Sequence, residues 1–173
     1  METLSFSDRL KNVFRYPQML KLLKAEFSRA RRYDFPLSLV LFEMINLRNL
    51  RDVHGYEAGE FIASEVIRLI EQESRISDFV CQYRGDVFAV ILTHTDLKGA
   101  RTFAERILKR METTGFKVGE ITVKVIPALG VAYGGEKNSL YMDSLLENAA
   151  KALESARQRG GACYEVFPPT TSS

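Results

Sequence analysis

Four segments of the chain repeat apolar residues at the spacing of an amphipathic helix. In the first of them, which begins at Pro17, the side chains of Leu20, Leu23 and Phe27 share one face. Proline is favoured in the first turn of a helix, where its missing N–H costs nothing. The pattern predicts helices over residues 17–33, 58–70, 97–111 and 145–156, with residues 1–16 as a helical lead-in.

The strongest strand signal is the almost continuous apolar run of residues 37–44, which predicts a strand covered on both faces. Residues 79–83 and 87–92 form two shorter apolar runs, with Arg84-Gly85-Asp86 between them. Glycine supplies the freedom that a tight turn needs. The two runs and their connection therefore predict a β-hairpin.

Two regions carry weaker signals. Residues 46–52 are polar and short, and Gly55 and Gly59 bracket a predicted turn before the second helix. We expect a loop here and a helix that starts at Ala58.

Residues 121–125 alternate between apolar and polar side chains, as a half-buried strand does, and residues 164–167 add a last short strand. Pro127 and Gly130 predict a bulge or a sheet edge between them.

The order of these elements predicts a mixed sheet with helices packed on it and the hairpin at its centre. We expect one domain over residues 1–167 and a flexible tail over residues 168–173.

Composition narrows the class of protein. The chain has 173 residues and a net charge of +2, so its charge indicates neither nucleic acid nor a membrane surface as a partner. No apolar run reaches the ~18 residues of a membrane span. Cys81 lies in an apolar run and is expected to be a buried free thiol, far from any zinc-binding spacing. These features predict a cytoplasmic protein.

The predicted hairpin resembles the signature of a known family. Arg84-Gly85-Asp86-Val87-Phe88, followed by an apolar strand, is similar to the Gly-Gly-Asp/Glu-Glu-Phe hairpin of GGDEF domains, the domains of diguanylate cyclases. Segments 29–42, 54–60, 95–106, 129–132 and 149–160 resemble the family in the same order, and the resemblance covers roughly residues 8–167. It implies an α+β, palm-like nucleotidyl-cyclase fold with a mixed, mostly antiparallel five-stranded sheet.

The resemblance also implies a chemistry that this sequence has lost in part. Diguanylate cyclases join two GTP molecules, and carboxylates hold the Mg²⁺ ions that neutralise the developing charge. Glu43 stands at the metal position at the end of the first strand, and Asp86 keeps the third hairpin position. The fourth hairpin position, a glutamate in the family, is Val87, which can neither ligate a metal nor take a proton. Glu43 and Asp86 remain weak metal candidates.

Other nucleotide-binding positions differ as well. The first hairpin glycine of the family is Arg84 here, and the guanine-reading asparagine is Arg51. The second guanine contact, an aspartate in the family, is Glu60, and the phosphate-contacting lysine is Arg48. These changes predict a catalytically inactive domain that needs neither Mg²⁺ nor another cofactor.

A second site of the family is retained. Its inhibitory site, which binds the product cyclic di-GMP, is marked by Arg-x-x-Asp five residues before the hairpin motif, and Arg75-Ile76-Ser77-Asp78 has this spacing. The resemblance adds Arg106 from the next helix and Arg29, which reaches across from a second copy. A guanidinium and a carboxylate suit the edges of guanine and its phosphates. The sequence thus predicts a bacterial cyclic di-GMP receptor, with a ligand-bridged homodimer and a signalling partner protein as possible assemblies.

Three alternatives stay open. Arg75 and Asp78 are also typical of a solvated ion pair at a helix end. The domain as a whole is compatible with a nucleotide-independent protein-interaction module that uses the hairpin around Arg84. The third alternative is a GTP-binding or residual cyclase domain that uses Glu43 and Asp86.

Overall fold

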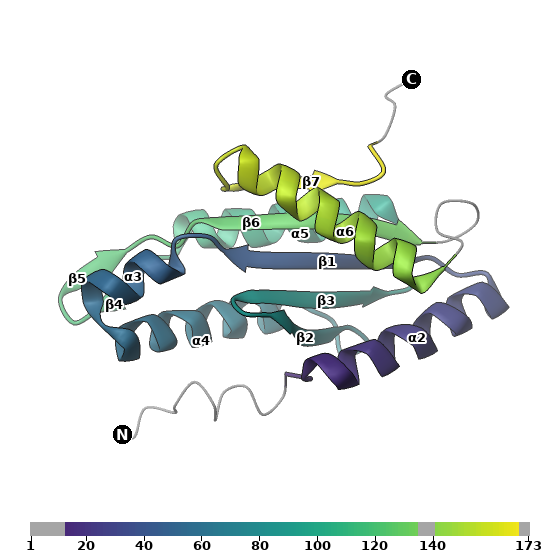
Figure 1. The fold of residues 1–173 in the computed structure, drawn as a ribbon, viewed down its shortest axis with the longest axis horizontal. Helices are drawn as coiled ribbons and strands as arrows, with labels where there is room; N and C mark the ends of the chain where they lie inside the picture. The colour runs from purple at the N-terminus through teal and green to yellow at the C-terminus, as the bar shows by residue number, and fades with distance from the viewer. Residues whose placement is uncertain (1–12, 135–140, 170–173) are drawn as a thin grey trace.

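The computed structural model describes residues 13–134 and 141–169 of the chain, and a five-stranded sheet with helices on both faces forms its centre (Figure 1). The helices are α2 (Tyr16–Tyr33), α3 (Leu47–His54), α4 (Tyr56–Glu73), α5 (Leu97–Thr113) and α6 (Met142–Gln158). The strands are β1 (Leu37–Met44), β2 (Phe79–Arg84), β3 (Val87–Thr93), β4 (Phe116–Val118), β5 (Ile121–Val123), β6 (Pro127–Gly134) and β7 (Cys163–Val166). The predicted α+β fold with a mixed, mostly antiparallel sheet is confirmed.

The strand order in the sheet is β2-β3-β1-β6-β7, and only the β6–β7 pair is parallel. The continuous apolar run of β1 lies at the centre, paired with β3 on one side and β6 on the other. The prediction that the hairpin occupies the centre is wrong, because β2 is an edge strand of this sheet. The hairpin tip therefore lies at the rim of the fold, where it is accessible.

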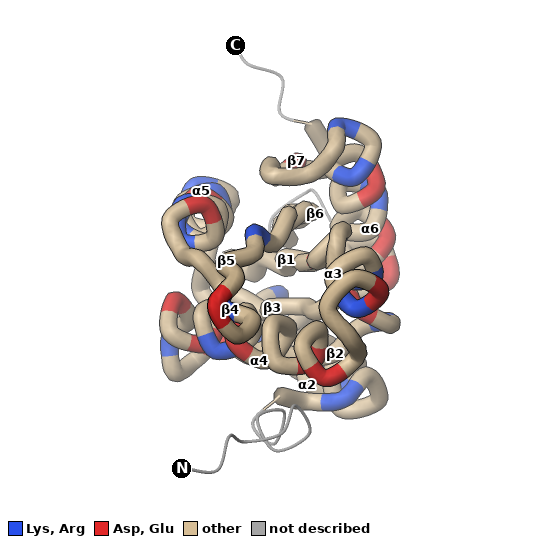
Figure 2. The backbone as a smooth tube through the Cα atoms, turned by 90° about the vertical axis from the view of Figure 1, so that its left-hand side faces the viewer, with Lys and Arg blue, Asp and Glu red and all other residues tan. Residues whose placement is uncertain are grey.

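Alternate side chains of β1 enter two separate apolar layers, as the two-residue period of a strand requires. Val40 and Phe42 pack with α4 and α5. Leu39 and Leu41 pack with α2 and α6 on the opposite face. Seen along the sheet, α4 and α5 cover one side and α2 and α6 the other (Figure 2).

The predicted loop over residues 46–52 is a helix. Leu47 and Leu50 are buried and anchor α3, which the high polar content of the segment concealed. Gly55, with φ 98°, separates α3 from α4, and α4 begins at Tyr56 rather than at Ala58. Gly59 lies within α4, so only Gly55 has the predicted role in the turn.

The predicted bulge or sheet edge near Pro127 and Gly130 is also wrong, because β6 is a regular strand that lies between β1 and β7. Pro127 is tolerated as the first residue of the strand. Gly130 lies against α6, where a Cβ would be 2.3 Å from the backbone nitrogen of Leu153. This glycine thus permits close helix–sheet packing instead of bending the strand. The β4–β5 pair forms a small second sheet that the sequence pattern predicted only in part.

The end of the predicted lead-in helix is extended. Phe14 forms an isolated parallel bridge with Cys81 on β2, through N–H···O bonds of 3.1 Å to Val80 and 2.7 Å from Gln82. The rest of the lead-in (residues 1–12) and residues 170–173 of the predicted tail lie outside the described residues. Cys81 is buried with a free thiol, as predicted. Among the described helices, none combines the length and the apolar character that crossing a bilayer requires.

Candidate functional site

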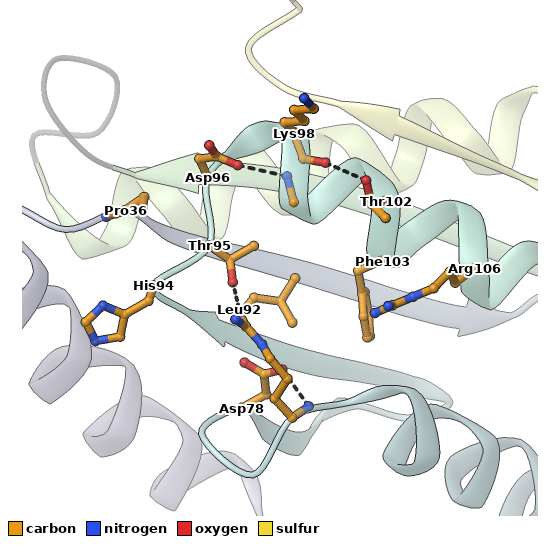
Figure 3. Close-up of a pocket in the computed structure, with 12 residues that line it drawn as sticks. Pro36, Asp78, Leu92, His94, Thr95, Asp96, Lys98, Thr102, Phe103 and Arg106 are labelled. Atoms are coloured by element: carbon orange, nitrogen blue, oxygen red, sulfur yellow. Dashed lines mark hydrogen bonds and ion pairs between the residues drawn. The ribbon is translucent and has the colours of Figure 1, made fainter.

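The residues of the predicted dinucleotide site lie around one pocket. Arg75, Asp78 and Arg106 all line a depression of about 480 Å³ between the α4–β2 turn, the end of β3 and the face of α5 (Figure 3). A volume of this size is in the range of small-molecule sites. Two regions that are far apart in the sequence, the turn at residues 75–78 and Arg106 on α5, are thereby brought to a single cavity.

The α4–β2 turn is built around the Asp78 carboxylate. Its Oδ2 accepts a hydrogen bond of 2.9 Å from the backbone N–H of Arg75, and its Oδ1 accepts one of 3.3 Å from the N–H of Thr93. The Asp78 side chain is only 2% exposed. The carboxylate therefore holds the turn against the end of β3 in addition to lining the pocket.

The Arg75 side chain runs from this turn across the pocket floor. Its Nη2 donates to the carbonyl oxygen of Thr93 at 2.9 Å and to the hydroxyl of Thr95, while Nε lies 3.5 Å from Asp78 Oδ2. The side chain nevertheless remains 57% exposed. These contacts position a guanidinium group at the surface of the pocket with part of its donor capacity facing solvent.

Arg106 approaches from α5. Its Nε lies 3.6 Å from Glu73 Oε2, and its side chain is 53% exposed. Glu73 also accepts a 2.7 Å hydrogen bond from Arg110, so its charge is shared between two cations. Arg29 does not line this pocket: it pairs with Glu26 at 3.3 Å on α2 and is 58% exposed.

The sequence analysis missed several residues of the pocket wall, including one imidazole and one further cation. His94 and Lys98 both line it, and the His94 ring stacks on Phe35 with centroids 3.9 Å apart. Between them, Asp96 begins α5 by accepting a 2.8 Å hydrogen bond from the N–H of Gly99. The capping pattern that opens α5 was visible in the sequence, but the proximity of its loop to Phe35 was not.

The hairpin lines a different pocket, of about 450 Å³, together with Glu43 and Arg157. Gly85 takes the turn with φ 48°, and Arg84 is exposed, its Cζ 5.4 Å from the centre of the Tyr83 ring. Val87 and Phe88 are 8% and 3% exposed and belong to the apolar layers of the sheet. The position that carries a glutamate in the family is thus part of the core here.

Asp86, the carboxylate retained in the hairpin, is bound by an arginine of α3. Arg51 donates from Nη1 and Nη2 to the two oxygens of Asp86, each at 3.1 Å, and from Nη2 to Glu60 at 2.8 Å. Burial lowers the pKa of Arg51, but the hydrogen bonds and charges of Asp86 and Glu60 outweigh it and raise that pKa above its usual value. Gly59 makes room for this arginine, because a Cβ there would lie 2.3 Å from Arg51 Cγ.

Glu43 is bound in a similar way. Arg157 on α6 donates from Nε to Glu43 at 2.5 Å and from Nη1 to Glu154 at 2.8 Å. The hydrogen bond to Glu43 is the largest cause of a raised pKa at Arg157. Within residues 13–134 and 141–169, no three histidine, cysteine or carboxylate side chains are grouped to hold a metal ion. Arg48, the last of the predicted nucleotide contacts, is exposed on α3.

Sequence comparison relates this architecture to known proteins. Residues 5–163 match the family described as diguanylate cyclase, GGDEF domain. Diguanylate cyclase A of Treponema denticola is 30% identical over 125 residues, which cover 72% of this chain and 33% of that protein. The chain spans about a third to a half of the length of the curated relatives it matches.

Solved structures agree on the fold. The active GGEEF domain of a diguanylate cyclase from Vibrio cholerae superposes with a TM-score of 0.85 at 20% identity, covering 91% of this chain and 99% of that one. The GGDEF domain of DgcB from Caulobacter crescentus, solved in complex with c-di-GMP, gives 0.83 at 18% identity and covers 91% and 90%. Because the family match extends over most of its length, the chain belongs to the GGDEF domain family of diguanylate cyclases.

Proposed function

We propose that this chain is a catalytically silent GGDEF domain that acts as a cyclic di-GMP receptor in bacterial second-messenger signalling. The observation that carries the proposal is the convergence of Arg75, Asp78 and Arg106 on one pocket from two separate parts of the fold. The DgcB structure with c-di-GMP is a precedent for the ligand within the same fold.

The charges of the pocket suit the ligand. Cyclic di-GMP carries two phosphates and two guanines, and a guanidinium can donate two parallel hydrogen bonds to a phosphate or to the O6/N7 edge of guanine. Arg75 and Arg106 are both more than half exposed, and Lys98 adds a third cation to the same wall. An anionic ligand would find three cationic side chains around one depression.

Asp78 has two tasks in this proposal. Its carboxylate fixes the turn that carries Arg75, through the hydrogen bonds from the N–H groups of Arg75 and Thr93. Its second task is electrostatic: Oδ2 lies 3.5 Å from Arg75 Nε and holds that guanidinium at the pocket, while the carboxylate itself is almost fully covered by protein. The solvated ion-pair alternative does not account for a carboxylate that is 2% exposed.

The proposed loss of catalysis rests on charge as well as on Val87. Mg²⁺ requires hard oxygen ligands in tight octahedral geometry. Asp86 and Glu43, the carboxylates left at the hairpin, are each engaged by an arginine. A metal ion would have to displace both guanidinium groups and would still lack the ligand that Val87 replaces, so the residues present do not fit Mg²⁺.

A second candidate function is protein interaction, alone or combined with ligand binding. Arg84 is exposed at the hairpin tip, and the 70% exposed Tyr56 lies with its ring 5.9 Å from Arg51 Cζ, beside the hairpin. Arg29 does not line the pocket that contains Arg75, and its side chain is more than half exposed. Both features are compatible with the proposed contact of Arg29 with ligand bound to a second copy of the chain. A partner pull-down unaffected by either GTP or cyclic di-GMP would favour the interaction module.

Calorimetric titration with cyclic di-GMP tests the receptor proposal. Wild-type protein should release heat on binding, and Arg75→Ala or Arg106→Ala should weaken binding at least about tenfold, as expected for lost hydrogen bonds to charged groups. Arg68→Ala is the matched control, because Arg68 is an exposed arginine that lines a different pocket. No heat with the wild type, or equal affinity in Arg75→Ala, would overturn the proposal. Incubation with GTP and Mg²⁺ should yield no product.

A further inference from the structure

One side of the Arg75 pocket carries the ring of His94, which is stacked on Phe35, a residue outside the pocket lining. The exposed imidazole of His94 stacks on Phe35, with ring centroids 3.9 Å apart and planes inclined by 23°. Figure 3 shows His94 and Pro36 at one side of the pocket and Phe103 and Arg106 at the other, with Asp78 between them. The pocket therefore offers two chemically different ends.

The backbone at His94 is held in a conformation that a residue with a side chain rarely adopts. Its φ is 50°, in the left-handed region. The loop is fixed directly after the strained position, because the N–H of Thr95 donates to the carbonyl of Pro36 at 3.2 Å and the Ser38 hydroxyl donates to the carbonyl of Thr95 at 2.8 Å. Strain that the surroundings hold in place is common at ligand sites.

A cyclic dinucleotide presents two bases, and the two ends of the pocket are suited to different kinds of contact. The Arg75–Asp78 end can read the hydrogen-bonding edge of one guanine. A flat ring such as that of His94 binds any base by its π-face, without reading its edge. One half of the ligand would then be recognised strictly and the other half loosely.

We propose that the Phe35–His94 stack is a base-stacking subsite that receives the second base of the ligand and makes the receptor tolerant at that base. The inference rests on the proposed function of the pocket and deepens it by naming the ligand class: cyclic dinucleotides with at least one guanine. Phe35 is a positioning residue, since it supports the imidazole from behind.

Titration with three ligands tests the specificity. Cyclic di-GMP and the mixed cyclic guanine–adenine dinucleotide should bind with similar affinity, because the adenine can stack on His94. Cyclic di-AMP should bind at least about tenfold more weakly, since neither base matches the Arg75–Asp78 end. Equal rejection of the mixed dinucleotide and of cyclic di-AMP would refute tolerance at the second base.

Variants at position 94 test the stacking itself. His94→Asn removes the ring but suits a positive φ, so the loop should fold as before. It should weaken cyclic di-GMP binding by about tenfold, the usual effect of losing one base–aromatic stack. His94→Phe should retain wild-type affinity, and Phe35→Leu should fall between the two. Thermal unfolding of each variant checks that the fold is intact.

The outcomes separate this inference from the function on which it rests. If wild type binds, Arg75→Ala fails to bind, and His94→Asn binds like wild type, the stacking subsite is refuted while the receptor function stands. If wild type binds none of the three dinucleotides, the receptor function is refuted and the subsite with it.

Discussion

The guanidinium of Arg51 binds both carboxylate oxygens of Asp86 at 3.1 Å and thereby joins α3 to the tip of the hairpin. The same group reaches Glu60 on α4 at 2.8 Å, so one arginine connects three elements. In the resemblance to active cyclases, position 51 reads guanine and position 86 holds a metal ion. In this chain the side chains at these two positions form hydrogen bonds and an ion pair with each other.

Loss of this arginine should lower the stability of the fold. Arg51→Ala leaves Asp86 and Glu60 as neighbouring carboxylates without their cation, and we expect a loss of about 1–2 kcal/mol in the free energy of unfolding, reduced by partial solvent exposure. Urea unfolding measures it. Arg48→Ala, one turn earlier on the same helix and exposed, should change stability by less than about 0.5 kcal/mol. Equal effects of the two variants would contradict the role of Arg51.

Restoring the missing hairpin carboxylate should not restore catalysis. Val87 is 8% exposed, so Val87→Glu places a charge in the apolar layer and should cost about 1–3 kcal/mol of stability. Asp86 and Glu43 would still be held by arginines. Product analysis after incubation with GTP and Mg²⁺ should detect no cyclic di-GMP, and Val87→Ala shows how much of the stability loss comes from packing alone. Turnover by the single variant would show that the arginines do not block the site.

Gly130 should be intolerant of any side chain. A Cβ at this position would lie 2.3 Å from Leu153 N and 2.4 Å from Ala149 O, and both are backbone atoms of α6 that cannot rotate away. Gly130→Ala should therefore destabilise the protein by about 1–3 kcal/mol, as overpacking does. Gly134→Ala is a control in the same strand, because its Cβ would meet ordinary contacts of 3.6 Å and longer. Thermal unfolding of the two variants should differ clearly.

Alkaline pH should destabilise the protein in part through Cys81. Burial raises the pKa of the Cys81 thiol from 9.0 to about 12. Below pH 9 the thiol is protonated in both the folded and the unfolded chain, so its contribution to stability is constant. Between pH 9 and about 12 the unfolded chain releases this proton more readily, and stability should fall by up to about 1.4 kcal/mol per pH unit.

Urea unfolding at pH 8 to 11 measures this slope. The free energy of unfolding of Cys81→Ala should decline less steeply with pH than that of wild type. This difference in slope does not depend on how much stability the cavity left by the substitution costs at neutral pH. Cys163→Ala serves as the comparison, because that thiol is only partly buried. Parallel slopes for wild type and Cys81→Ala would show that the thiol has the same pKa in the folded and the unfolded chain, which contradicts a pKa raised by burial.

The regular elements of the fold were predictable because their apolar periodicity is strong. The central strand over residues 37–44 and the helix that begins after Arg15 follow directly from it. α3 was not predictable in the same way, since only Leu47 and Leu50 are buried among its polar residues. Gly130 was misinterpreted because a glycine that admits a neighbouring helix and a glycine that bends a strand look alike in sequence.

The candidate site likewise has a part that the sequence predicts and a part that only the structure shows. Arg75 and Asp78 were predicted from their spacing relative to the hairpin, and Arg106 from the family resemblance, and both need only the linear sequence. The burial of Asp78, the stack of His94 on Phe35 and the pairing of Arg51 with Asp86 depend on contacts between segments distant in the chain. Spacing along the sequence does not carry information of that kind.

The two arginine–carboxylate pairs at the hairpin imply that its counter-ions come from the polypeptide itself. Carboxylates that rely on a bound Mg²⁺ ion for charge balance change their surroundings when the ion leaves. Here both cations belong to the same chain, so the hairpin surface should not change with the Mg²⁺ concentration.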